Sequence, residues 1–319
     1  MIYFLISLVL VLQSLWFSGA TWLRDKASSI YAETLPKNQA SLLSGVVLGS
    51  VGLDHQFKNK LADAGVIHVV AASGMNVSIF SGFLLAFLSK IRISKTIKVI
   101  VAIAFTLFYA TLTGFAPPIV RATIMFVFAL VASLFGRQNS GFVGLFIAAF
   151  LMLSVSPKLV TDASFLLSFT SMTSQIFLST IRFDLPKLPA LVIENFLQSF
   201  LALLFTLPLV VIFFAKFSLV AIFTNILVLW TIEPLMILGG VEIVLGIFFT
   251  EAARIIALPA SGLLGFFLWV VNYFSQPSWA VVHWVLLPGW PTALFILGYY
   301  LTLGGIIIAF NERRNFNRG

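Results

Sequence analysis

The sequence has no cysteine, only three histidines and few charged residues, and each shortage excludes a class of protein. The absence of cysteine excludes a disulfide framework, and His55, His68 and His283 are too few for a zinc cluster. No G-x-x-x-x-G-K-[ST] run is present, so this chain has no P-loop of its own. We therefore expect no metal and no cofactor, and we do not expect the chain to be an enzyme.

Charged residues make up 9% of the 319 residues, and hydrophobic residues make up 60%. A soluble domain has about 25% charged residues, so this composition indicates a protein with many membrane segments. The net charge of +8 permits an anionic substrate without showing one, because membrane proteins collect Lys and Arg on their cytoplasmic side.

The apolar segments predict an all-α polytopic membrane protein with about ten transmembrane helices. Residues 1–23 are the first transmembrane helix, and residues 24–63 are a short extracytoplasmic segment. Within that segment, the apolar run 40–51 is too short to span comfortably, so we expect an amphipathic helix on the outer surface. Residues 64–310 form the main membrane domain, and residues 311–319 are a basic cytoplasmic tail.

One predicted helix is too long for a single straight crossing. A helix over residues 217–249 would extend about 50 Å. Because Glu233-Pro234 and Gly239-Gly240 interrupt it, we expect a broken helix, a feature that often lines membrane substrate paths.

The distribution of Lys and Arg predicts the orientation. With both termini on one side, that side receives most of the loop cations, namely Lys90, Arg92, Lys95, Lys98, Arg137, Arg182, Lys187, Arg254, Arg313, Arg314 and Arg318. Apart from the cations of residues 24–63, the opposite loops receive only Arg121, Lys158 and Lys216. We therefore expect both termini in the cytoplasm and residues 24–63 outside.

The stretch 61–90 is uncharged from residue 65 to residue 89, yet its first half is polar for a membrane helix. Around Gly74 it carries His68, Ser73, Asn76 and Ser78. Any one such serine is more often a helix-packing contact than a ligand. Together, these polar groups must face protein or water rather than lipid, and the small Gly74 lets another backbone approach. The cluster therefore indicates a site.

A second polar set follows the helical period. Its members are three or four residues apart, which places them on one helical face: Thr161, Ser164, Ser168, Ser171 and Gln175. In a bilayer such a face must meet a partner helix or an aqueous path, whereas Asp162 is best explained as the helix cap.

Three isolated polar residues complete the candidates. Arg121 follows a Gly/Pro turn by one helical turn, and it is either a snorkelling anchor or a functional arginine. Glu233 looks deep in the bilayer, where it is either paired with a cation or protonated. Asn225 lies earlier in the same long segment.

Several of these residues carry a resemblance to the ComEC family, the inner-membrane channel for DNA uptake in natural competence. Residues 68–77 read H-V-V-A-A-S-G-M-N-V, where many members have H-L-L-A-I-S-G-L-H-V. This chain therefore differs at Met75 and Asn76. Further matches are T-G…R-A-x-x-M, from Thr113 to Met125, and F-x-L-S-F at residues 165–169. From Thr206 onward, the chain also matches the family's order T-L-P…F…S…N-L…P.

The resemblance implies a membrane channel that conducts single-stranded DNA across the cytoplasmic membrane during natural transformation. Together with the polar faces, it implies a DNA path along His68, Ser73, Gly74, Asn76, Ser78, Arg121, Ser164, Ser168, Ser171, Gln175, Asn225 and Glu233.

Larger members add an external oligonucleotide-binding domain and a metallo-β-lactamase-like domain. Residues 24–63 are too short for the first, and no H-x-H-x-D-H cluster marks the second, so we expect the membrane core alone. The expected partners are single-stranded DNA, membrane lipids, a separate cytosolic helicase-like ATPase, and a separate outer nuclease or DNA-binding protein.

Two alternatives belong to other classes. A small-molecule or lipid transporter or flippase would be favoured by an inverted repeat, and none is visible by eye. An intramembrane hydrolase would need a nucleophile beside a base. His68 and Ser73 are five residues apart, which places them about 140° apart around a helix axis and disfavours that pairing.

Overall fold

The computed structural model describes residues 2–49, 53–70, 73–137, 140–179, 187–283, 294–296 and 298–302. Its α-helices are α1 (Ile2–Thr34), α2 (Lys37–Ser44), α3 (His55–Asp63), α4 (Ile67–Val70), α5 (Gly74–Ser89), α6 (Lys95–Leu112), α7 (Pro117–Leu134), α8 (Gly141–Val155), α9 (Ala163–Ser179), α10 (Lys187–Phe214), α11 (Ala221–Phe248) and α12 (Thr250–Ser275). Shorter elements are the π-helix η1 (Gly45–Gly49), the 3₁₀ turns η2 (Pro157–Thr161) and η3 (Ser278–Ala280), and the strands β1 (Lys216–Ser218) and β2 (Val281–His283).

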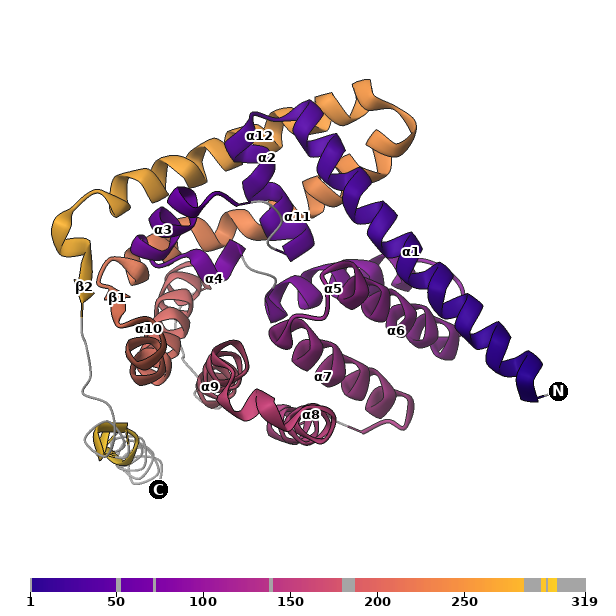
Figure 1. The fold of residues 1–319 in the computed structure, drawn as a ribbon, viewed down its shortest axis with the longest axis horizontal. Coiled ribbons are helices and arrows are strands. Elements are labelled where there is room, and N and C mark those ends of the chain that lie inside the picture. Colours follow the sequence, from indigo (N-terminus) through magenta and orange to yellow (C-terminus); the bar gives the residue numbers. More distant parts are fainter. Residues whose placement is uncertain are drawn as a thin grey trace.

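The helices do not form one parallel bundle. In Figure 1, α8, α9 and α10 are seen nearly end-on, whereas α1, α11 and α12 run across the view. The main core lies where α1, α2 and η1 pack with α11 and α12, and it includes the fully buried side chains of Tyr31, Leu43, Leu235 and Phe267.

The all-helical prediction is confirmed, but a count of about ten crossings is not. Within the described residues, five helices are long and apolar enough to cross a membrane: α6, α7, α11, α12 and the Phe196–Phe214 part of α10. The apolar helices α5 and α8 have 16 and 15 residues, which is short for a full crossing. The sequence also predicts a span over residues 292–310, which lies almost wholly outside the described residues.

The first helix is longer than the sequence indicated. It runs for 33 residues to Thr34, past the predicted boundary at residue 23. Arg24, Asp25 and Lys26 suggested a loop, but they are side chains that a helix can carry as long as its other face is packed. Ala27, Ile30 and Tyr31 supply that packed face in the core.

The predicted amphipathic helix on the outer surface is wrong. Residues 40–49 form the end of α2 and all of η1, and they are nearly all buried in the core rather than laid along a surface. Residues 40–49 are too short to span a membrane, and the run has no polar face that would lie against water. Packing against α1, α11 and α12 therefore covers all of its sides, which a membrane surface would not do.

The predicted break in the long helix is not confirmed. α11 is continuous from Ala221 to Phe248, with Pro234 inside it. A proline removes one backbone hydrogen bond and can bend a helix without ending it. Residues before 221 instead form β1, which pairs antiparallel with β2.

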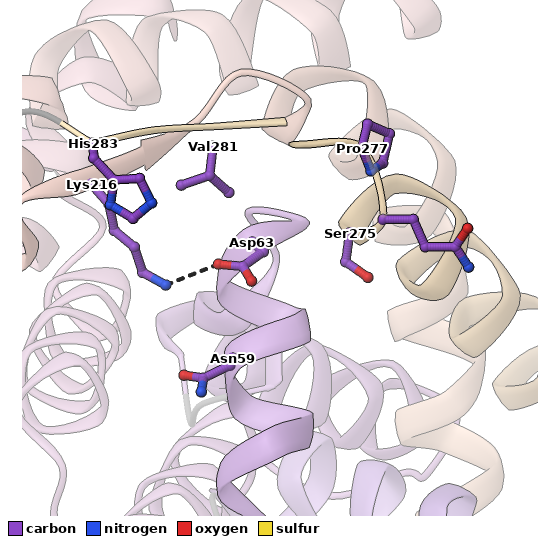
Figure 2. Close-up of a pocket in the computed structure, with 8 residues that line it drawn as sticks. Asn59, Asp63, Lys216, Ser275, Pro277, Val281 and His283 are labelled. Atoms are coloured by element: carbon purple, nitrogen blue, oxygen red, sulfur yellow. Dashed lines mark hydrogen bonds and ion pairs between the residues drawn. The ribbon is translucent and has the colours of Figure 1, made fainter. Parts of the chain in front are cut away.

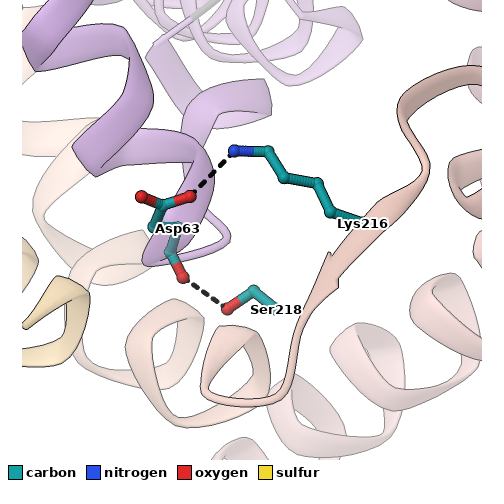
Figure 3. A network of polar contacts seen from close by, with 3 residues as sticks. All are labelled: Asp63, Lys216 and Ser218. Carbon is teal, nitrogen blue, oxygen red and sulfur yellow. Dashed lines mark hydrogen bonds and ion pairs between the residues drawn. The ribbon is translucent and has the colours of Figure 1, made fainter. Parts of the chain in front are cut away.

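The β1–β2 ribbon brings together three segments that the charge distribution assigned to the outer side. Lys216 forms an ion pair with Asp63 at the end of α3, with Nζ and Oδ1 2.9 Å apart (Figure 3). Ser218 Oγ donates to the Asp63 carbonyl at 2.7 Å. Lys216 is in turn the cross-strand partner of His283.

Candidate functional site

The turn before α7 positions the site. Gly114 and Phe115 both have positive φ, of 77° and 55°, which reverses the chain within a few residues. α7 then begins at Pro117, where a proline loses no helical hydrogen bond. Arg121 follows one turn later, as predicted.

Arg121 is buried and does not snorkel. Arg121 is only 7% exposed, and its Nη1 donates to the Ser168 carbonyl on α9. The guanidinium carbon lies 5.9 Å from the centroid of the Phe169 ring. Arg121 therefore joins α7 to the F-x-L-S-F segment of α9, two of the segments that were singled out separately in the sequence.

Gly74, the first residue of α5, packs against the Arg121 side chain. A Cβ atom built on Gly74 would lie 2.7 Å from Arg121 Nη2 and 3.3 Å from Ala122 Cβ. Because that first distance is shorter than a normal contact, any side chain at position 74 would require the Arg121 guanidinium to shift. The structure thus brings Gly74, Arg121 and Ser168 together, and we call these three residues the Arg121 site.

The Arg121 site holds a buried cation without an acid. In the described part of the chain, the ion pairs are Lys216–Asp63 and Arg254–Glu251, so no described carboxylate pairs with Arg121. Its Nε and the Ser168 Oγ are buried without a hydrogen-bond partner there. Burying an unpaired charge is costly, so this arrangement favours an anion as a transient ligand.

A neighbouring set of hydrogen bonds holds the π-helix η1. Asn76 Nδ2 donates to the Val46 carbonyl at 2.7 Å, and Tyr109 Oη donates to the Val47 carbonyl at 3.0 Å. Arg24 Nη2 donates to the Gly49 carbonyl at 3.3 Å. Side chains from α5, α6 and α1 thus satisfy backbone groups of a buried segment. Ser73 Oγ donates to Asn76 Oδ1 at 2.9 Å and fixes the amide.

The polar residues on one face of α9 differ in their exposure and in their contacts. Asp162 caps the helix as expected, because its Oδ1 accepts from the Phe165 backbone amide at 2.8 Å. Ser164 and Gln175 are exposed at the two ends of the stripe, and Ser171 is half-buried. Only Ser168 reaches the Arg121 site.

The remaining candidates do not reach the Arg121 side chain. His68 and Ser78 are exposed, and Ser78 Oγ donates to the Gly74 carbonyl. Glu233 is exposed on α11 rather than enclosed in the protein. Asn225 is buried, and its Oδ1 has no hydrogen-bond partner among the described residues. No hydrogen bond between described residues joins any of these four side chains to Arg121.

Sequence reasoning missed the acid that is enclosed. Glu242, not Glu233, is fully buried, and it accepts a hydrogen bond from Thr34 Oγ1 where α1 crosses α11. Tyr31 Oη donates to the Gly239 carbonyl at 2.9 Å at the same crossing. The i, i+3 spacing of Gly239 and Glu242 places them on one helical face, and this signal could have identified the pair.

A family model described as Competence protein matches residues 46–310, which is most of the chain. No solved structure matches this chain. The match includes α5, α7 and α9, the elements that build the Arg121 site.

Two curated relatives are similar over long stretches. "ComE operon protein 3" of Bacillus subtilis (strain 168) is 25% identical over 206 residues, which is 64% of this chain and 26% of the relative. "Uncharacterized protein YcaI" of Escherichia coli (strain K12) is 27% identical over 280 residues, which is 82% of this chain and 35% of the relative. The chain therefore spans only about a quarter to a third of the length of these relatives.

Proposed function

This chain belongs to the Competence protein family, and on that premise we propose that it conducts single-stranded DNA across the cytoplasmic membrane during natural transformation. The family and the relative named for the ComE operon support a role in competence. Helices long and apolar enough to cross a membrane support a membrane location.

The observation that carries the proposal is the unpaired buried cation at Arg121. A strand of DNA offers one anionic phosphodiester per nucleotide, and guanidinium is well suited to bind phosphate oxygens. Nε is buried without a hydrogen-bond partner among the described residues, while Nη1 donates to the Ser168 carbonyl. A single buried arginine would contact each phosphate in turn without the strong retention that several cations would impose.

The exposed part of the α9 stripe extends this polar surface. Ser164 and Gln175 offer hydroxyl and amide groups on the helix that already contacts Arg121. Such neutral groups hydrogen-bond to sugar and phosphate oxygens without sequence preference. In this account, Asn76 acts behind the path by holding η1 in place, rather than by contacting the strand.

The orientation and the partners belong to the same proposal. We place both termini in the cytoplasm and the α3, β1 and β2 segments on the outer side, because the outer loops hold few cations. The sequence lacks a P-loop, so a separate cytosolic helicase-like ATPase would drive the strand. A separate outer nuclease or DNA-binding protein would deliver it.

The test is complementation of a chromosomal deletion in the natural host, with transformation frequency as the readout. Arg121→Gln should lower transformation about tenfold or more while the protein remains in the membrane, because only the charge and fork are lost. Arg121→Lys should restore part of the activity through its remaining charge. Normal transformation by Arg121→Gln at equal protein level would contradict the proposal.

A further inference from the structure

A polar cavity of about 340 Å³ lies between the end of α3, the β1–β2 ribbon and the end of α12. Figure 2 shows Asn59, Asp63, Lys216, Ser275 and His283 around it. Gln276 also lines it. In a chain with so few charged residues, three titratable side chains therefore converge on one hollow, at a distance in sequence from the Arg121 site.

The cavity walls are held by contacts between distant segments. Lys216 and His283 are directly paired across the ribbon, so their side chains lie on the same face of it. The Lys216–Asp63 ion pair and the bond from Ser218 Oγ to the Asp63 carbonyl fasten α3 to β1. The lining is therefore built before any ligand arrives.

The chemistry of the lining selects a ligand with both an anionic and an amide-like part. Asp63 already neutralises Lys216, so inorganic phosphate alone would find little net attraction. His283 and the far side of the Lys216 ammonium can still donate to a phosphodiester oxygen. The amides of Asn59 and Gln276 and the Ser275 hydroxyl offer donors and acceptors to the edge of a nucleobase.

We propose that this cavity binds one nucleotide of an incoming unpaired DNA strand on the outer side, before the strand reaches Arg121. The inference rests on the proposed function. A base paired in a duplex has its hydrogen-bonding edge occupied, so the cavity would favour single-stranded over duplex DNA. The cavity would thus act as a capture site, separate from the Arg121 site that passes the strand inward.

The experiment measures binding of a fluorescein-labelled twelve-nucleotide single strand to the purified protein in lipid nanodiscs, by fluorescence anisotropy. Asn59→Ala and His283→Ala should each weaken binding about threefold to tenfold, because each removes one or more hydrogen bonds. Gln56→Ala and His55→Ala are the matched controls. These two side chains are exposed on α3 and do not line the cavity, so binding should not change.

The outcomes separate this inference from the proposed function. Unchanged binding by both Asn59→Ala and His283→Ala, or equal affinity for the duplex of the same sequence, would overturn the capture site. In the Arg121→Gln background, Asn59→Ala should weaken binding by the same factor as it does alone, because the two sites are separate. If the cavity variants bind normally and Arg121→Gln still lowers transformation about tenfold, the conduit stands and the capture site does not.

Discussion

The amide nitrogen of Asn76 donates to the carbonyl oxygen of Val46 at 2.7 Å, and this bond links the first turn of α5 to the buried π-helix η1. Both residues are buried. A backbone carbonyl in an apolar interior needs a donor, and the Asn76 amide supplies one to Val46. The relationship gives Asn76 a structural role beside the Arg121 site.

Asn76→Leu should therefore lower stability, because it removes the donor and leaves the Val46 carbonyl unsatisfied. We expect a loss of about 1–3 kcal/mol in the free energy of unfolding, seen as a lower midpoint in detergent. Met75→Leu is the control, because Met75 is exposed on the same helix. Equal midpoints for the two variants would show that the bond contributes nothing.

Gly74→Ala should impair uptake by displacing the Arg121 guanidinium. The new Cβ would lie 2.7 Å from Nη2, so the fork must move away from the Ser168 carbonyl. We expect transformation to fall about tenfold, as for a lost charge-assisted hydrogen bond.

Gly82→Ala on the same helix is the matched control, since nothing lies within 4 Å of its added Cβ. In the Arg121→Gln background, Gly74→Ala should lower transformation by a much smaller factor than it does in the wild-type chain. Additive losses would show that the two residues act independently.

Gly239→Ala should destabilise the crossing of α1 and α11. Its Cβ would lie 2.9 Å from both Tyr31 Oη and Val47 Cγ2, and 3.1 Å from Leu43 Cδ1. Overpacking of this kind costs about 1–3 kcal/mol. Gly262→Ala, whose Cβ meets nothing within 4 Å, should leave the unfolding midpoint unchanged. The comparison of the two midpoints is the measurement.

Glu242→Gln should be tolerated, whereas Glu242→Ala should lower the unfolding midpoint. The glutamine amide retains an oxygen that can accept from Thr34 Oγ1, and it adds no charge to the buried crossing. Alanine leaves Thr34 without that partner and opens space in the core. A glutamine variant as unstable as the alanine variant would show that the carboxylate charge itself is needed.

The sequence predicted local features that depend on few neighbours. The Gly/Pro turn, the proline start of α7, the position of Arg121 one turn later and the Asp162 cap all follow from the chemistry of adjacent residues. The motif resemblance led to the family, because its residues were quoted in order and the family match covers them.

Features that depend on tertiary packing could not be predicted from adjacent residues. The run 40–49 is equally apolar whether it lies on a membrane or in a core, and only the contacts of α1, α11 and α12 decide between them. Glu233 and Glu242 are nine positions apart on one helix, and the i, i+3 spacing of Glu242 and Gly239 is the local signal that distinguishes them. The cavity between α3 and the β1–β2 ribbon joins segments more than 150 residues apart in sequence, such as Asp63 and Lys216.

The claim that the strand passes Arg121 is tested most directly by cross-linking during uptake. The chain has no native cysteine, so Ser168→Cys places a single thiol on the residue whose backbone carbonyl accepts from Arg121, and Gly82→Cys places one elsewhere. Cells taking up DNA that carries bromoacetamide groups tethered to its phosphate linkages should alkylate the thiol at position 168, with loss of bromide, and not the thiol at position 82. The absence of a cross-link at position 168, in cells that transform normally, would contradict the account.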